Sequence, residues 1–137
     1  MEAAIPMNTQ PYVEPGAREA ERQYAMFNHI VGIASVASWG VPLLGFFAVM
    51  AMWLIRKADS PYLDDHGREA MNFQISLIFY YIILMIPLSI VTFGLWALFV
   101  PVLNVLGCVL AAMAAHKGQY YRYPMTIRFI GPRPEAA

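Results

Sequence analysis

The sequence contains few charged residues. Lysine, arginine, aspartate and glutamate together make up 13% of its 137 residues, whereas a soluble domain usually carries about 25%. Hydrophobic residues make up 59%, so there are too few charges to cover a surface that faces water. The nine basic and nine acidic residues balance, which leaves no net positive field to draw nucleic acid. The composition therefore excludes an ordinary soluble domain and predicts no nucleic-acid partner.

Cysteine is almost absent. Cys108 is the one cysteine, so the chain cannot form an internal disulfide, and its thiol is expected to pack as a small apolar group. The sequence also lacks a nucleophile elbow, a glycine-rich phosphate loop and a paired-carboxylate motif. Asp65, His66 and Glu69 could in principle bind a metal ion or act on a lipid, but no second cluster supplies further ligands. We therefore expect a protein that is not an enzyme and holds no cofactor or metal ion.

The N-terminal residues do not have the pattern of a cleavable signal. Residues 1–22 contain Pro6, Pro11 and Pro15 together with acidic residues, whereas a signal peptide has a basic start followed at once by an apolar core. We expect this segment to be a disordered polar tail.

Two long blocks, residues 23–55 and 70–115, contain no charged residue. The second block divides at the turn-like sequence Val-Thr-Phe-Gly (91–94) into predicted helices at about 66–90 and 95–116. The apolar spans within them, 70–90 and 95–116, have ~20 residues each, close to the length that a ~30 Å hydrocarbon core requires. As a single helix, the first block would be roughly 50 Å long, which needs more tilt than membrane helices usually have.

Gly40 and Pro42 lie near the middle of the first block and predict a hairpin of helices at about 23–38 and 41–57. Each arm is short for a full crossing, so the hairpin is expected either to span a thinned bilayer or to be re-entrant and covered by protein. The predicted fold class is all-α: a membrane bundle of about four helices over residues 23–117, followed by a C-terminal tail at 118–137.

The charges fall into three islands: the N-terminal tail, the loop at 56–69, and the residues after His116. A hairpin in the first block brings all three islands to one side. That side then holds every lysine and arginine, as the positive-inside rule expects for the cytoplasmic face. We therefore expect a multi-pass protein of the bacterial inner membrane with both termini in the cytoplasm. Within the loop, Ser60 and Pro61 have the pattern of a helix N-cap and first helical residue.

Polar residues recur on one face of the third predicted helix. Asp65, Glu69, Asn72 and Ser76 follow the spacing i, i+4, i+7 and i+11, with Tyr80 at i+15. This polar stripe, with His66 beside it, runs from the interface into the bilayer, where polar groups need partners, so it should face the bundle. One hypothesis is a polar cavity or a protein-contact groove. The simpler alternative is hydrogen bonding between helices.

The last predicted helix has a face of small residues. Gly107, Ala111 and Ala115 follow a spacing that lets backbones approach closely, and Asn104, one turn earlier, needs a partner in lipid. This face predicts packing within the chain, with self-association as the alternative.

The C-terminal tail begins with aromatic residues and an arginine. Tyr120, Tyr121, Arg122 and Tyr123 suit the headgroup region of a bilayer. We expect these four residues to anchor the tail at the membrane interface.

Four segments, taken together, resemble a known family. Residues 28–29 read Asn-His, residues 53–57 read WLIRK, residues 60–76 read SPYLDDHGREAMNFQIS, and residues 118–128 read GQYYRYPMTIR. They resemble the bacterial Tic-twenty-like family, small membrane proteins of unknown function that are distantly similar to a subunit of the chloroplast inner-envelope protein translocon. The resemblance implies a four-helix membrane bundle with cytoplasmic termini, no catalytic residues and a role in protein handling.

The leading hypothesis is a non-enzymatic membrane protein that acts through protein contacts, as a subunit or an adaptor. Its expected partners are the lipid bilayer and either an unidentified membrane protein or further copies of itself. The alternative is a small oligomeric channel or carrier whose entrance is lined by the polar stripe.

Overall fold

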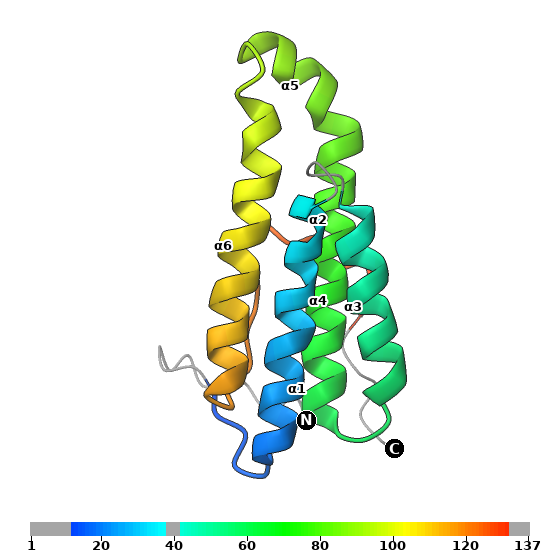
Figure 1. Ribbon diagram of the computed structural model, residues 1–137, viewed down its shortest axis with the longest axis vertical. Helices are drawn as coiled ribbons and strands as arrows, with labels where there is room; N and C mark the ends of the chain where they lie inside the picture. Colours follow the sequence, from blue (N-terminus) through cyan, green and yellow to red (C-terminus); the bar gives the residue numbers. More distant parts are fainter. Residues whose placement is uncertain (1–11, 38–41, 132–137) are drawn as a thin grey trace, which may run out of the picture.

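The computed structural model describes residues 12–37 and 42–131, and its regular elements in these ranges are helices (Figure 1). The described residues contain no β-strand, only an isolated antiparallel bridge between Val13 and Gln119. The all-α prediction is therefore confirmed. In chain order the elements are α1 (Glu19–Ile30), the 3₁₀ turn η1 (Val31–Ile33), α2 (Ala34–Ala37), α3 (Leu43–Arg56), α4 (Pro61–Phe79), the π-helical turn η2 (Tyr80–Leu84), α5 (Met85–Val91) and α6 (Trp96–His116).

The elements form two antiparallel hairpins of unequal height (Figure 1). The short hairpin consists of α1, η1 and α2 going one way and α3 returning. The tall hairpin consists of α4, η2 and α5, followed by α6. α1 packs against α6 and α4, and α3 packs against α4. We call the end with the starts of α1 and α4 and the ends of α3 and α6 the charged end. The end formed by η2, α5 and the start of α6 is the apolar end.

Helix α4 begins where its sequence predicts. The Ser60 hydroxyl accepts a hydrogen bond from the Leu63 amide at 3.2 Å, and Pro61 occupies the first turn. Pro61 suits this position because backbone N–H groups in the first turn of a helix have no partner within the helix, so the N–H that proline lacks costs no hydrogen bond. The N-cap prediction is confirmed, and the helix starts five residues before the predicted membrane segment at 66–90.

The expectation of disorder does not hold for residues 12–22. The Glu14 amide donates to the Gly118 carbonyl at 2.8 Å, and the Tyr120 amide donates to the Tyr12 carbonyl at 3.0 Å. Helix α1 begins at Glu19 because the Glu21 carboxylate caps it, accepting from the Arg18 amide at 2.8 Å. That hydrogen bond lowers the pKa of Glu21. Residues 1–11 lie outside the described residues.

The predicted turn between the last two helices is confirmed. α5 ends at Val91 and α6 begins at Trp96. Between them Phe93 and Gly94 adopt φ values of 54° and 86°, the left-handed region that glycine occupies without strain. The Thr92 hydroxyl accepts from the Trp96 amide at 3.0 Å and so satisfies the first backbone N–H of α6.

Two described helical stretches are long and apolar enough to cross a membrane: Pro61–Val91, with 31 residues, and Trp96–His116, with 21. Only 17% and 33% of their most apolar windows are buried. The apolar side chains therefore face outward, unlike those of a core helix in a soluble protein. Helix α3, with 14 residues, is shorter, about 21 Å. The tip of the short hairpin, residues 38–41, lies outside the described residues.

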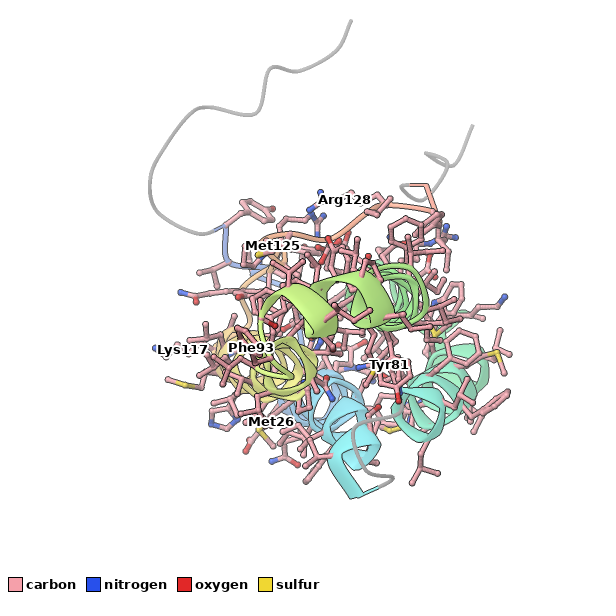
Figure 2. All side chains as sticks on the ribbon, turned by 90° about the horizontal axis from the view of Figure 1, so that it is seen from above. Met26, Tyr81, Phe93, Lys117, Met125 and Arg128 are labelled. Atoms are coloured by element: carbon pink, nitrogen blue, oxygen red, sulfur yellow. The ribbon has the colours of Figure 1, made fainter. Side chains whose placement is uncertain are left out.

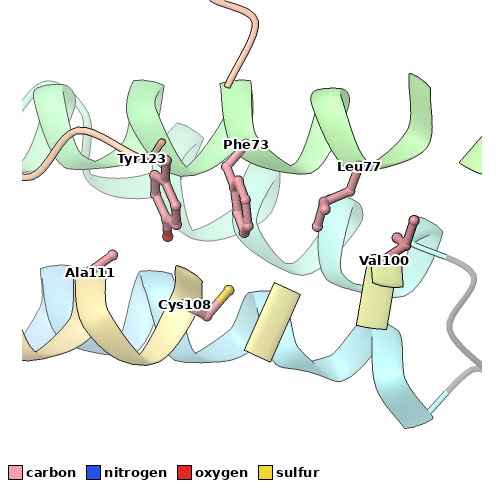
Figure 3. Close-up of a cluster of buried hydrophobic side chains, with 6 residues drawn as sticks. All are labelled: Phe73, Leu77, Val100, Cys108, Ala111 and Tyr123. Atoms are coloured by element: carbon pink, nitrogen blue, oxygen red, sulfur yellow. The ribbon is translucent and has the colours of Figure 1, made fainter. Parts of the chain in front are cut away.

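The largest core cluster joins three parts of the chain (Figure 3). Phe73 and Leu77 of α4 pack with Val100, Cys108 and Ala111 of α6, and the Tyr123 ring from the C-terminal tail stacks on Phe73 with centroids 4.0 Å apart. The tail is thus part of the core, not an appendage to it.

Candidate functional site

The polar stripe of α4 is covered by the chain's own C-terminal tail. We call residues 118–131 the C-terminal strap. The strap leaves the end of α6, runs in extended form beside α4, reverses at Pro124 and Met125, and returns toward the charged end. Viewed down the long axis, Met125 and Arg128 lie along one side of the bundle, opposite Met26 (Figure 2). Each of the five stripe residues makes at least one hydrogen bond to the strap.

Near the charged end the stripe binds the strap through ion pairs. Asp65 and Arg122 form a two-pronged pair with both N–O distances at 2.7 Å. Glu69, which is 4% exposed, accepts from the Tyr123 amide at 2.8 Å and from Arg128 at 3.2 Å. A buried carboxylate is stable only when its charge is paired and its oxygens are hydrogen-bonded. The strap supplies Glu69 with an ion pair and a backbone donor, both at Oε1.

Farther along α4 the stripe binds the strap's backbone. The Asn72 side-chain amide donates to the Ile130 carbonyl at 2.9 Å, and its oxygen accepts from the Ile130 amide at 2.7 Å. The Ser76 hydroxyl accepts from the Ile127 amide at 2.8 Å, and the Tyr80 hydroxyl donates to the Met125 carbonyl. An extended segment has unpaired backbone groups that are costly to bury. The stripe satisfies them with side chains spaced along one helix face.

The structure therefore brings Asp65, Glu69, Asn72 and Ser76 together as a strap-binding surface. His66, the other residue singled out beside the stripe, points elsewhere. Its Nδ1 lies 2.8 Å from Nε2 of His29, and Nδ1 of His29 lies 2.7 Å from the Tyr123 hydroxyl. Both histidines are fully buried. At least one of the two facing nitrogens must lack a proton, so the pair cannot carry two charges.

The described residues contain no group of three histidine, cysteine, aspartate or glutamate side chains placed to hold a metal ion. Asp65 pairs with Arg122, His66 with His29, and Glu69 with Tyr123 and Arg128. These three residues thus diverge to different partners, and the metal hypothesis has no geometric support among the described residues.

The small-residue face of α6 is occupied within the chain. A Cβ atom on Gly107 would come within 2.6 Å of the Phe73 ring. Ala111 belongs to the same core cluster as Phe73, and Ala115 packs with residues of α1 and α4. Asn104 donates to the Gly32 carbonyl at 3.0 Å and accepts from Gln74 at 3.3 Å. This face joins α6 to the rest of the bundle.

The four residues predicted to anchor the tail have different surroundings. Tyr123 is buried against Phe73, and burial raises its pKa well above the ordinary value, so its hydroxyl stays protonated. Tyr120 stacks on Tyr12 and donates to Glu14 at 2.8 Å. Tyr121 is partly exposed and Arg122 is exposed. The outward apolar groups of the strap are instead Met125, Ile127 and Phe129.

Sequence reasoning missed a buried polar layer in the middle of the bundle. The Ser35 hydroxyl accepts from the Gly45 amide at 3.1 Å, and Gln74 lies between Ser35 and Asn104. These residues come from η1–α2, α3, α4 and α6, so one layer joins both hairpins. The signal was present, because Ser35 and Gln74 are polar residues inside charge-free blocks, but the contacts of Gln74 with Ser35 and Asn104 span 39 and 30 residues of sequence.

Comparison with known proteins decides the family. Residues 20–130 match the sequence model of MamF/MmsF, the magnetosome magnetite crystal formation protein family. The chain belongs to this family. The match covers the whole bundle and nearly all of the strap. No curated protein and no solved structure matches the chain. Membership of MamF/MmsF and the two span-length helices both indicate a membrane protein.

This finding corrects the resemblance drawn from sequence. The chain is not a Tic-twenty-like protein, because the family that matches is MamF/MmsF, and the translocon-like expectation has no support. The segments that suggested the resemblance, residues 60–76 and 118–128, are largely those that hold the strap against α4. Their pattern reports an intramolecular contact and carries no information about protein translocation.

Proposed function

We propose that this MamF/MmsF protein is a multi-pass protein of the magnetosome membrane with its charged end and both termini in the cytoplasm. In this proposal it acts in magnetite crystal formation through protein contacts and not as an enzyme. The helices of the two hairpins would bring both termini to the same side.

The distribution of charge is the observation that carries the topology. In the part of the chain that the structure describes, the lysines and arginines lie at the charged end or on the strap held against α4. They are Arg18, Arg22, Arg56, Lys57, Arg68, Lys117, Arg122 and Arg128. The apolar end, residues 80–96, contains no charged residue. The positive-inside rule assigns the basic side to the cytoplasm.

This topology supports an indirect effect on the crystal. The end that would face the magnetosome interior is the turn at residues 92–95, Thr-Phe-Gly-Leu, which has no carboxylate to bind iron. The charged end instead exposes a loop with Lys57 and Asp59, together with Lys117 after α6. A water-exposed charged surface of this kind suits contact with another protein.

The test combines a partner measurement with crystal imaging in a magnetite-forming bacterium in which variants replace the original chain. We expect the double substitution Lys57→Gln and Lys117→Gln to lower the amount of protein that co-extracts stoichiometrically in native lipid patches, and to change crystal size in electron micrographs. Six described basic residues remain to orient the chain. The matched control, Phe93→Leu in the opposite turn, should leave both readouts unchanged. A crystal phenotype in the Phe93 variant alone would contradict the proposal.

A small oligomeric channel or carrier is the alternative, favoured by the buried polar layer of Ser35, Gln74 and Asn104. Against it, the stripe residues expected to line an entrance are bonded to the strap. Ion flux in proteoliposomes that is lost in Glu69→Gln would favour this alternative. Unchanged flux in that variant would remove Glu69 from any such role.

A further inference from the structure

The molecule has unequal cross-sections along its length. At the charged end and through the middle, α1, α3, α4 and α6 lie side by side with the strap along α4 (Figure 1). Of the helices that the structure describes, η2–α5 and the start of α6 alone reach the apolar end. Among the described elements, α5 packs against η2 and α6. The protein is therefore wide at one end and narrow at the other.

Burial along one continuous helix reflects the same change. Thirteen of the nineteen residues of α4 are buried, whereas η2 and α5, which continue it, have none. Ile86 and Ile90 of α5 are 70% and 73% exposed, and Phe93 in the turn is 97% exposed. Within residues 12–37 and 42–131 no side chain covers them, so we assign that role to lipid.

The wide part also has an apolar outer surface. Phe27 and Ile30 on α1 and Leu44, Phe47 and Leu54 on α3 are exposed. Met125 and Phe129 extend this surface over the strap. Exposed apolar groups at these positions place much of the wide part in hydrocarbon, so the change in width lies within the bilayer and not between a membrane anchor and a water-soluble domain.

Hydrogen bonds join the elements of the wide part to one another. Asn104 of α6 binds the backbone of Gly32, and Gln74 of α4 binds Asn104. Gly45 of α3 lies so close to Ser35 and the Gly32 carbonyl that no Cβ atom would fit. Such polar contacts are hard to exchange for others inside a bilayer, because hydrocarbon offers no alternative partner. Polar contacts thus connect both hairpins across the wide part.

We infer that this protein is a bilayer wedge that favours strongly curved membranes, with the charged end in the convex leaflet. Four helices and the strap occupy more area in that leaflet than two helices occupy in the other. In a curved bilayer the convex leaflet has more area than the concave one, so it accommodates the wider end of the protein. A flat bilayer has leaflets of equal area and does not. The partner is the lipid of a curved bilayer, as in the outer leaflet of a small vesicle. This inference does not depend on which leaflet faces the cytoplasm.

The test uses two orientations of the same protein as mutual controls. The full chain with Lys117→Cys is reconstituted into small vesicles and labelled from outside with one impermeant thiol dye. The vesicles are then opened, labelled with a second dye, and fused into giant vesicles. Cys108 is 1% exposed, so we expect the dyes not to label it. Thin membrane tethers are pulled, and the tether-to-vesicle ratio of each dye is measured.

We expect the population with its charged end outside to be enriched in tethers and the population with its charged end inside to be depleted. The ratio for each dye should move further from one as the tether is made thinner. Equal ratios for the two orientations would overturn the inference, since sorting by lipid composition or membrane fluidity ignores orientation. Enrichment of the inward population would also overturn it. Neither result would contradict the proposed cytoplasmic orientation, which is measured separately by thiol labelling of intact magnetosomes.

Discussion

The charged end and the apolar end of this protein differ in what surrounds their side chains, which is protein at the charged end and lipid at the apolar end. At the charged end, α4 buries Glu69 and Asn72 because the strap supplies a partner for each. At the apolar end, its continuation buries nothing, since a bilayer solvates isoleucine and leucine without help from protein. The comparison shows that helix packing in this chain follows the polar groups. The bundle is wide where charged and amide side chains need partners, and narrow over residues 80–96, which contain neither kind.

The largest loss of stability is expected from a substitution in the wide part, at the contact between α3 and α4. A Cβ atom on Gly67 would overlap the Trp53 side chain. We expect Gly67→Ala to lower the free energy of unfolding by about 1–3 kcal/mol, as overpacking usually does, measured by denaturant titration in bicelles. Helix propensity alone predicts the opposite sign, a gain of up to ~1 kcal/mol.

The matched substitution at the apolar end is Ile86→Ala. Its side chain is 70% exposed, and lipid replaces the lost contacts, so we expect a change within about 0.5 kcal/mol. A loss of stability in Ile86→Ala as large as that in Gly67→Ala would mean that the two ends do not differ in packing.

A second substitution in the wide part tests whether the polar stripe holds the strap against α4. Asn72→Ala removes both hydrogen bonds to Ile130, and each is worth about 1 kcal/mol. We expect amide hydrogen exchange to accelerate in residues 127–131 while α6 keeps its protection. The control is Thr126→Ala on the same strap, whose Oγ1 has no hydrogen-bond partner among the described residues. Equal acceleration in both variants would show that Asn72 does not hold the strap.

The smallest expected effect is a dependence on pH at the start of α1. The hydrogen bond from the Arg18 amide holds the pKa of Glu21 below its ordinary value of 4.5. A lowered folded pKa means that this stabilisation is fully present above 4.5 and is lost as the pH falls through the folded value. Amide exchange at residues 18–22 should therefore accelerate selectively as the pH falls below about 4.5. Glu21→Gln should remove this selective pH dependence, and an unchanged profile in that variant would assign it to another group.

Much of the helical framework could be predicted from sequence, because charge-free blocks and turn residues are local signals. The turn at Phe93 and Gly94 and the cap at Ser60 follow from single residues. The spacing of Asp65, Glu69 and Asn72 identified one helix face, but periodicity shows only which side chains lie together. It does not show what covers them.

The strap could not be found in this way. Residues 125–129 alternate apolar and polar side chains, which indicates an extended segment but not the surface that it covers. Its partners on α4 and η2 lie 45–63 residues away in sequence. His29 and His66, 37 residues apart, meet only because α1 packs on α4. Long-range pairs of this kind depend on the relative placement of helices, which the sequence pattern of each helix does not contain.

Orientation in the magnetosome membrane is the most direct test of the functional account. Single cysteines at Lys117 and at Phe93 would be introduced with Cys108 replaced by alanine, and intact magnetosomes would be treated with an impermeant thiol reagent. The account predicts that Lys117→Cys is labelled at once and that Phe93→Cys is labelled only after the membrane is permeabilised. Immediate labelling at position 93 with protection at position 117 would place the charged end toward the crystal and contradict the proposal.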